Sequence, residues 1–255
     1  MTQKPQANPF GEELSPQAAR GYERVRPGYP PEAIREICSR VPGRGRVADL
    51  GAGTGQLTKS LISEGLEVVA VEPSASMRTV LMGKPWAKVD TLQVIPTLAE
   101  QTGLAPHSVD AVVWADSFHW LNASEAANEA SRVLKRPGFA FLLANQLDVS
   151  KPWVHRLSRI MRSGDVLKEI PAGLLEPAFS LASQKEWTWE QSLLTTELME
   201  LAQTRSSYLR SPEQTRTRMQ RNLDWYLHEH LGFERAQEVS LPYRTLLWVF
   251  ALQSK

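Results

Sequence analysis

Three glycines directly after a short apolar segment place the strongest limit on what this chain can fold into. Residues 47–56 read Val-Ala-Asp-Leu-Gly-Ala-Gly-Thr-Gly-Gln, so an apolar strand runs into glycines at 51, 53 and 55. Glycine lets the backbone turn sharply and approach a ligand with no side chain in between. A second apolar strand ends on Glu72, where a carboxylate could hold the hydroxyls of a ribose. We therefore predict a nucleoside-cofactor site, against the alternative that the glycines only form a strand-to-helix loop.

The spacing of these glycines helps to identify the cofactor. It is G-x-G-x-G, whereas the dinucleotide fingerprint is G-x-G-x-x-G, and Gln56 stands where the third dinucleotide glycine would fall. A dinucleotide needs its diphosphate on a helix N-terminus, and its third glycine allows close helix–strand packing. The long side chain of Gln56 disfavours that packing. A nicotinamide-dependent oxidoreductase stays open as a less favoured alternative.

Composition sets the outer bounds. At 255 residues the chain forms one large domain, or a core with an added subdomain. Its 29 basic and 28 acidic residues give no global electrostatic case for nucleic acid or an anionic membrane. The single cysteine, Cys38, excludes an internal disulfide and a multi-cysteine metal site. The polar N-terminus and the absence of a long apolar run predict a cytoplasmic protein without a membrane partner. We expect a monomer or a homodimer.

The first half of the chain alternates strands with helices, which is typical of parallel β-α units. Proline at 30 or 31 opens a helix with apolar Ile34 and Ile37. The predicted strands are 46–50, 67–72, 92–95, 108–114 and 139–144, and the other predicted helices are 55–63, 74–81 and 123–134. This order predicts an α/β fold with a doubly wound sheet.

The second half has a different pattern. Residues 151–183 read as helical and then irregular, 186–193 and 239–252 as strands, and 195–231 as two helices. The second helix has a predicted capping box from Ser211 to Gln214. A helical lid at about 195–232 would then cover the carboxyl edge of the sheet, where open α/β sheets bind ligands.

Several motifs together resemble a known family over nearly the whole chain. They are residues 22–30 (Tyr-Glu-Arg-Val-Arg-Pro-Gly-Tyr-Pro), 49–55, 71–74, 99–104, 108–110, 117–120 (Ser-Phe-His-Trp), 132–138, 145–153, 206–208 and 241–245. The chain is similar to the type 11 class I S-adenosylmethionine (SAM) methyltransferases, in a branch resembling trans-aconitate methyltransferases and related small-molecule enzymes. The resemblance implies a Rossmann-like, mostly parallel sheet whose last strand is antiparallel. It divides the chain into a cofactor-covering segment (1–30), a SAM-binding core (31–145) and a C-terminal part (146–255) that completes the sheet and carries the lid.

The resemblance also implies which residues hold SAM. Gly51, Ala52, Gly53 and Gly55 would pass under the methionine part, with Asp49 near its amino group, and Glu72 would accept both ribose hydroxyls. Ala99 would meet the adenine edge, but Leu98 replaces the aspartate of many relatives, and Glu100 is a substitute for that contact. The predicted cofactor residues are Tyr22, Arg26, Asp49, Gly51, Ala52, Gly53, Gly55, Gln56, Glu72, Pro73, Leu98, Ala99, Asp116, Ser117 and Phe118.

In similar enzymes the segment before the first helix folds over the cofactor, and an arginine meets the SAM carboxylate. Arg26 is the candidate here, because a guanidinium and a carboxylate match as a bidentate pair. Tyr22 or Tyr29 would stack near the sulfonium. The alternative is that residues 26–30 are a linker facing solvent.

The acceptor side is less defined by sequence. His119 would orient or deprotonate a nucleophile, since imidazole titrates near neutrality, or would only shape the pocket wall. We predict a substrate pocket of Tyr29, His119, Trp120, Trp153, Arg205 and Tyr208. Trp153, Trp187, Trp189 and Trp225 would line a cavity or fill core. The basic stretch of arginines 205, 210, 216, 218 and 221 would attract an acidic substrate or RNA, or form a solvated helix face, which is favoured.

These observations favour a methyltransferase (EC 2.1.1.-) that uses SAM, yields S-adenosylhomocysteine and methylates a small molecule on oxygen, a carboxylate or hydroxyl, or on nitrogen. No metal and no nucleic acid partner is expected. One alternative is a non-catalytic SAM-binding or regulatory module of the same fold, because fold does not fix function. An RNA methyltransferase is a weaker possibility.

Overall fold

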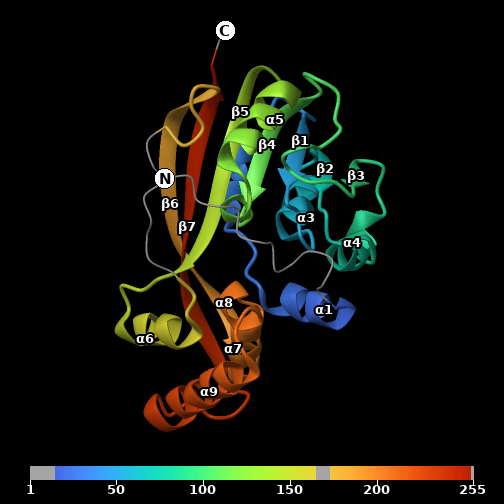
Figure 1. Cartoon of the computed structure of the whole chain (residues 1–255). Helices are drawn as coiled ribbons and strands as arrows, with labels where there is room; N and C mark the ends of the chain where they lie inside the picture. The colour runs from blue at the N-terminus through green and yellow to red at the C-terminus, as the bar shows by residue number, and fades with distance from the viewer. Residues whose placement is uncertain (1–14, 165–172, 254–255) are drawn as a thin grey trace.

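A seven-stranded sheet in the order β3-β2-β1-β4-β5-β7-β6 organises the molecule. The computed structural model describes residues 15–164 and 173–253. β1 (Arg46–Leu50), β2 (Glu67–Val71), β3 (Leu92–Ile95), β4 (Val109–Ala115) and β5 (Leu134–Leu147) are parallel neighbours, and β7 (Glu238–Leu252) runs antiparallel to both β5 and β6 (Phe179–Leu194). The predicted α/β sheet with an antiparallel last strand is confirmed (Figure 1).

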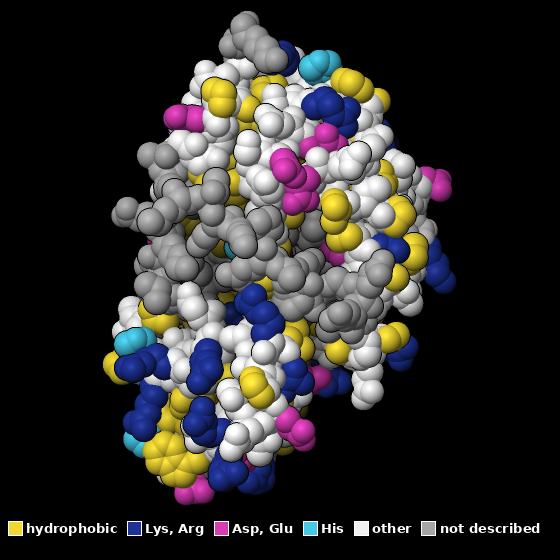
Figure 2. Space-filling view, viewed as in Figure 1, with side chains coloured by type: hydrophobic (Ala, Val, Ile, Leu, Met, Phe, Trp, Pro, Cys, Tyr) yellow, Lys and Arg dark blue, Asp and Glu magenta, His cyan; other side chains and the backbone are white. Residues whose placement is uncertain are grey.

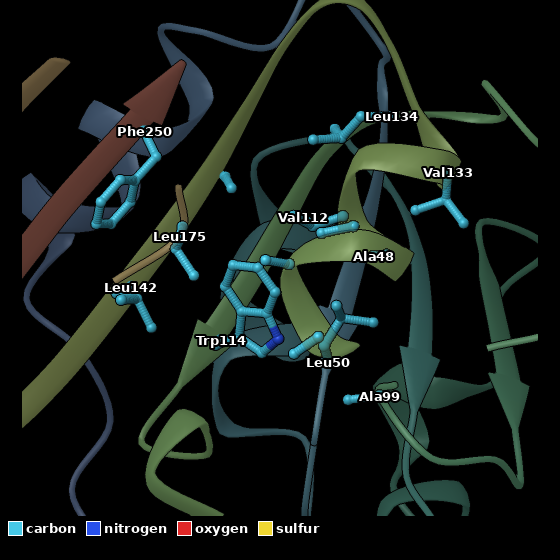
Figure 3. Close-up of a cluster of buried hydrophobic side chains, with 14 of the residues drawn as sticks. Ala48, Leu50, Ala99, Val112, Trp114, Val133, Leu134, Leu142, Leu175 and Phe250 are labelled. Carbon is cyan, nitrogen blue, oxygen red and sulfur yellow. The ribbon is translucent and has the colours of Figure 1, made fainter. Parts of the chain in front are cut away.

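Helices cover both faces of this sheet, as a doubly wound fold requires. Ala48 and Trp114 of the central strands face α5 (Ala123–Val133), and Figure 3 shows Trp114 at the centre of this cluster. Val47 and Val113 face the other way, toward α2 (Pro31–Cys38) and α3 (Gln56–Ser63). Because successive strand side chains alternate between faces and both faces are covered, these strands are apolar throughout.

The remaining elements lie mostly at the ends of the strands. They are α1 (Pro16–Val25), α4 (Ala75–Met82), the short 3₁₀ helices η1 (Pro85–Ala87) and η2 (Phe118–Trp120), α6 (Pro152–Met161), α7 (Thr195–Gln203), α8 (Ser206–Leu209), α9 (Glu213–Asp224) and the π-helical turn η3 (Trp225–His230). Figure 1 shows α6, α7, α8 and α9 together beyond the carboxyl ends of the parallel strands. They share a core with Val25, Leu147 and Tyr243. We refer to α6 to α9 as the lid, which adds α6 to the helices expected at about 195–232.

Two expectations for the second half are wrong in detail. β6 begins at Phe179 rather than at 186, because its first residues pair with the end of β7. α9 begins at Glu213 with Pro212 at its N-cap and without a side-chain cap. The hydroxyl of Ser211 donates instead to the carbonyl of Ser207 at 2.7 Å, so the predicted capping box does not form. Residues 1–14 of the predicted cofactor-covering segment, and Pro171 in the predicted irregular stretch, lie outside the described residues.

Candidate functional site

The glycine loop between β1 and α3 turns at positions that only glycine fits. Gly51 has φ +79°, its N–H donates to the carbonyl of Val71 at 2.8 Å, and a Cβ there would lie 2.6 Å from Cβ of Ser117. Gly53 has φ +59°, yet a Cβ there would meet nothing within 4 Å. Both positions are in the left-handed region, which costs other residues about 1–2 kcal/mol. Gly51 is thus required by packing, whereas Gly53 borders open space.

Glu72, at the end of β2, holds this loop in place. One carboxylate oxygen accepts from the N–H of Gly53 at 2.8 Å and the other from the N–H of Ser74 at 2.8 Å. The side chain is buried, which raises the pKa of Glu72, while the two N–H donors lower it. Each carboxylate oxygen has a second acceptor site, so the group can still take two further hydrogen bonds.

Asp49, at the end of β1, is a buried carboxylate that is only half satisfied. Its Oδ2 accepts from the hydroxyl of Thr58 at 2.6 Å. Its Oδ1 has no hydrogen-bond partner among the residues that the structure describes. Burial raises the pKa of Asp49 to about 7, and the neighbouring charge of Glu72 acts in the same direction. A buried acceptor without a partner costs free energy, so this site favours a ligand that donates.

Asp49 and the glycine loop face a cavity that α1, the residues after it and the lid close from the other side. Its predicted members are Tyr22, Arg26, Tyr29, Asp49, Gly51, Ala52, Gly53, Gln56, Asp116 and Arg205. Sequence reasoning missed Pro27, Thr54, Leu57, Ala115, Asn145 and Tyr243. Asn145 had a signal, because it lies just after the predicted strand 139–144, at the same sheet edge. Tyr243 lies in the family-like segment 241–245, but that segment gave no sign of a cavity position, which follows from the pairing of β7 with β5.

A second carboxylate, the half-buried Asp116, also lines the cavity. It follows β4 with φ +52°, a conformation rare for residues other than glycine. Its Oδ2 accepts from the hydroxyl of Tyr29 at 3.0 Å, and its Oδ1 accepts from the N–H of Asn145 at 3.0 Å. Burial raises the pKa of Asp116, whereas the N–H of Asn145 and the charges of Arg26 and Arg205 lower it. Burial also raises the pKa of Tyr29, so its hydroxyl keeps the proton that it donates.

Arg26 joins the segment after α1 to the lid. Its guanidinium donates to the hydroxyl and to the carbonyl of Thr204, each at 3.0 Å, and lies 4.8 Å from the ring centroid of Tyr22. Gln56 makes a similar link, donating from Nε2 to the carbonyl of Glu23 at 3.0 Å. The bond from Gln56 ties α3, on the side of the glycine loop, to α1 on the other side of the cavity.

Several predicted pocket residues lie outside the residues that line the cavity. His119 is exposed on η2, with its ring centroid 4.6 Å from that of Trp120. Trp153 packs edge-on against Phe233, and the ring of Tyr208 lies under the guanidinium of Arg216. Trp153 and Tyr208 therefore belong to the packing of the lid, because the apolar faces of its helices must be buried against one another.

The residues predicted to contact the adenine ring, and several other predicted cofactor residues, lie in the loops that follow the neighbouring strands. Ala99 is buried, Leu98 is 56% exposed, and Glu100 is engaged with the N–H of Asn122 at 3.1 Å, a bond that competes with a role at the adenine. Ser117 donates its hydroxyl to the carbonyl of Leu50 at 2.6 Å. Gly55 is the N-cap of α3, while Pro73 follows Glu72, and Phe118 packs edge-on against Trp114 at 5.1 Å. Gly55, Glu72, Pro73, Leu98, Ala99, Ser117 and Phe118 border the glycine loop or the neighbouring strand ends without lining the cavity.

Two absences hold for residues 15–164 and 173–253. These residues contain no group of three or more His, Cys, Asp or Glu side chains that could hold a metal ion. None of their helices is long and apolar enough to cross a membrane.

Comparison with known proteins gives a consistent set of relatives. The profile of a methyltransferase domain, type 11, matches residues 48–142. An uncharacterised methyltransferase of Mycobacterium tuberculosis is 37% identical over 230 residues, covering 90% of this chain and 91% of the relative. An uncharacterised methyltransferase of Schizosaccharomyces pombe is 31% identical over 214 residues, covering 80% and 82%.

Solved structures show the same fold at lower identity. A protein of Anaeromyxobacter dehalogenans, described as a type II methyltransferase, is similar with a TM-score of 0.65 and 23% identity, covering 89% of this chain and 97% of that one. A phosphoethanolamine N-methyltransferase of Haemonchus contortus, solved with phosphomonomethylethanolamine and S-adenosylhomocysteine, is similar with a TM-score of 0.56 and 15% identity, covering 94% and 58%.

Proposed function

The chain belongs to the type 11 methyltransferase-domain family, and from this premise we propose that it binds SAM at the glycine loop and methylates an oxygen of a small-molecule acceptor. The trans-aconitate-like branch remains part of the proposal. The Haemonchus structure, with its S-adenosylhomocysteine, supports the choice of cofactor.

One observation carries the proposal. Gly53, next to the cavity, has open space where a Cβ would stand, and its N–H is fixed by a Glu72 carboxylate that can still accept. Asp49 adds a buried acceptor oxygen without a partner in the described part of the chain. Two carboxylates with acceptor capacity on either side of a backbone-lined opening fit the amino group and ribose diol of a nucleoside such as SAM.

The chain's own residues would then hold the cofactor and keep water out. Glu72 would accept hydrogen bonds from the ribose hydroxyls, and Asp49 would accept one from the amino group of SAM. Arg26 would bind the SAM carboxylate with the guanidinium N–H groups that do not donate to Thr204. When bound, SAM supplies an electrophilic methyl group on a positively charged sulfur. α1, the residues after it and the lid close the cavity, which excludes water and fixes the attack geometry.

On the acceptor side, Asp116 and Tyr29 are better placed than His119. Both line the cavity and are hydrogen-bonded to each other, whereas His119 is exposed on η2. Arg26 and Arg205 supply positive charge to the same cavity. This combination suits an acceptor that carries a carboxylate, or a hydroxyl that must lose a proton.

The test has two steps. A thermal shift with SAM and with S-adenosylhomocysteine tests the cofactor, and transfer of a labelled methyl group into fractionated metabolites tests the acceptor. We expect both nucleosides to raise the melting temperature and one metabolite fraction to take up label. No shift with either nucleoside would overturn the proposal, whereas a shift without transfer to any metabolite would favour a non-catalytic binding module.

A further inference from the structure

A groove on the lid concentrates positive charge away from the glycine-loop cavity. It lies between α6 and α9, has a volume of about 680 Å³, and shares no lining residue with that cavity. Its walls carry Arg156, Arg159, Arg162 and Arg218, and none of the described residues that line it is a carboxylate. Figure 2 shows Lys and Arg side chains gathered over this part of the molecule. The α6 arginines were not part of the basic stretch identified from the sequence.

The shape of the groove follows from how the two helices pack. Leu157 and Met161 of α6, together with Met219 and Leu223 of α9, are buried in the lid core. Their burial turns the opposite helix faces outward. Arg156 and Arg159 are three residues apart, so their side chains leave α6 about 4.5 Å apart along its axis, and Arg162 follows as the C-cap of the helix with φ +50°. The fold therefore presents a row of guanidinium groups on one wall.

Several arginines elsewhere in the molecule are paired with carboxylates. Arg35, Arg132, Arg235 and Arg244 each form an ion pair with a carboxylate. Among the described residues, Arg159, Arg162 and Arg218 form none, and residues 151–164 contain four Lys and Arg but no Asp or Glu.

Neighbouring groups moderate this charge only slightly. Arg156 lies over the rings of Trp225 and Tyr226, at 5.5 and 5.3 Å from their centroids. Glu213 lies beside Arg218 in the adjoining hollow on α9. Like charges held together raise the free energy of the folded chain unless an anion binds between them.

The chemistry of the lining selects the anion. Guanidinium groups bind phosphate through paired N–H donors, and Thr215 and Asn222 add neutral polar groups on the α9 side. The volume lies within the range of small-molecule sites, about 300–1,000 Å³. We propose that this groove is a binding site for a ligand carrying a cluster of phosphate groups, independent of the methyl-transfer site.

The experiment uses inorganic tripolyphosphate as the probe and the full chain as the protein. Isothermal titration calorimetry at low and at physiological salt should show saturable binding at one site. Arg159→Gln with Arg218→Gln should weaken it about a hundredfold, roughly tenfold for each guanidinium removed. The matched control is Arg35→Gln with Arg235→Gln, which removes the same charge from exposed, ion-paired arginines and should change affinity less than about twofold.

Further outcomes are decisive. Equal weakening in the control pair, or no saturable binding by the wild type at low salt, would overturn the proposal. So would a single-stranded oligonucleotide that binds more tightly than tripolyphosphate. Because Arg159 and Arg218 are exposed, both double variants should melt within a few degrees of the wild type. Arg159→Lys with Arg218→Lys should recover only part of the affinity, since lysine keeps the charge but lacks the paired donors.

A vesicle assay identifies the source of the phosphate. Binding to phosphatidylcholine vesicles that contain phosphatidic acid, but not to phosphatidylcholine alone, assigns the groove to a lipid headgroup, provided that tripolyphosphate competes. Saturable tripolyphosphate binding without vesicle binding assigns it to a soluble phosphate ester.

Discussion

The two walls of the glycine-loop cavity are built over very different distances along the chain. On the glycine-loop wall, the bond from Gly53 to Glu72 spans 19 residues and the bond from Thr58 to Asp49 spans 9. On the opposite wall, the bond from Arg26 to Thr204 spans 178 residues. The first wall is therefore a property of one strand–helix–strand unit. The second exists only when the whole fold has assembled.

This difference predicts how each wall responds to change. The wall of local contacts suits the cofactor, which is the same in every reaction cycle. The wall of distant contacts can be altered through the lid without disturbing the glycine loop. Variants on the first wall should mainly change cofactor binding or loop stability. Variants on the second should mainly change acceptor use, with Arg26 as the exception, because its guanidinium is the proposed partner of the SAM carboxylate.

Glu72→Ala should have the largest effect. It removes the acceptor for the Gly53 and Ser74 N–H groups and for the proposed ribose contacts. Two hydrogen bonds to a charged group contribute about 1.5–3 kcal/mol each, so SAM affinity should fall by roughly a thousandfold. Calorimetry measures this directly, with Glu67→Ala, an exposed residue at the start of the same strand, as the control. Retained affinity in Glu72→Ala would remove the local wall from the cofactor site.

Asp49→Asn should change stability in a pH-dependent way, by up to a few kcal/mol. The folded-state pKa of Asp49, about 7, lies above its ordinary value of 3.8, so the native state holds the proton more tightly than the unfolded state. Wild-type stability then falls as pH rises from about 4 to above 7, by about 1.4 kcal/mol for each pH step of one between these limits. Urea unfolding at pH 8 should find the asparagine variant more stable than wild type, and the difference should vanish near pH 4.

The control for this prediction is Asp90→Asn, an exposed position whose substitution should leave the pH profile unchanged. If Asp49→Asn also leaves the profile unchanged, the carboxylate is not buried as the structure shows. SAM should reduce the pH dependence of the wild type, provided that its amino group pairs with Asp49.

Arg26→Ala should weaken SAM binding about tenfold, the scale of one lost charge-assisted contact. The control is Arg20→Ala, an exposed arginine on the preceding helix α1. Arg26 belongs to the distant wall through Thr204, so the variant separates the two walls. An unchanged dissociation constant for SAM with a raised KM for the acceptor would assign Arg26 to the acceptor alone.

The sequence was sufficient for the parts of the molecule that depend on near neighbours. Glycines 51 and 53 with Glu72 were found because strand, loop and next strand are read in one short stretch, and the alternation of strands and helices predicted the sheet. Thr204 and Tyr243 could not be found in this way. Their positions depend on where the lid folds back and on the register of β7, and no short spacing in the sequence encodes either.

His119 shows the same limit from the other direction. A histidine in a motif that follows a strand is a reasonable candidate base by type and position. In the structure, Asp116 lines the cavity and has a left-handed backbone conformation. His119, three residues later in the chain, is exposed and does not line the cavity. Backbone conformation at a single residue is set by its surroundings, so residue type alone could not choose between them.

Tyr29→Phe should have the smallest effect on cofactor binding and so gives the sharpest test of the two-wall comparison. It deletes only the hydroxyl that donates to Asp116, and Asp116 keeps its bond from the Asn145 N–H. SAM affinity should stay within about twofold, while acceptor kcat/KM falls by about tenfold, since one partly buried hydrogen bond to a charged group is lost. With one donor fewer, the pKa of Asp116 should rise, which moves the acid limb of the pH–rate profile toward higher pH. If Tyr29→Phe instead weakens SAM as strongly as Arg26→Ala does, then the cofactor depends on the distant wall beyond Arg26, and the division between the walls does not hold.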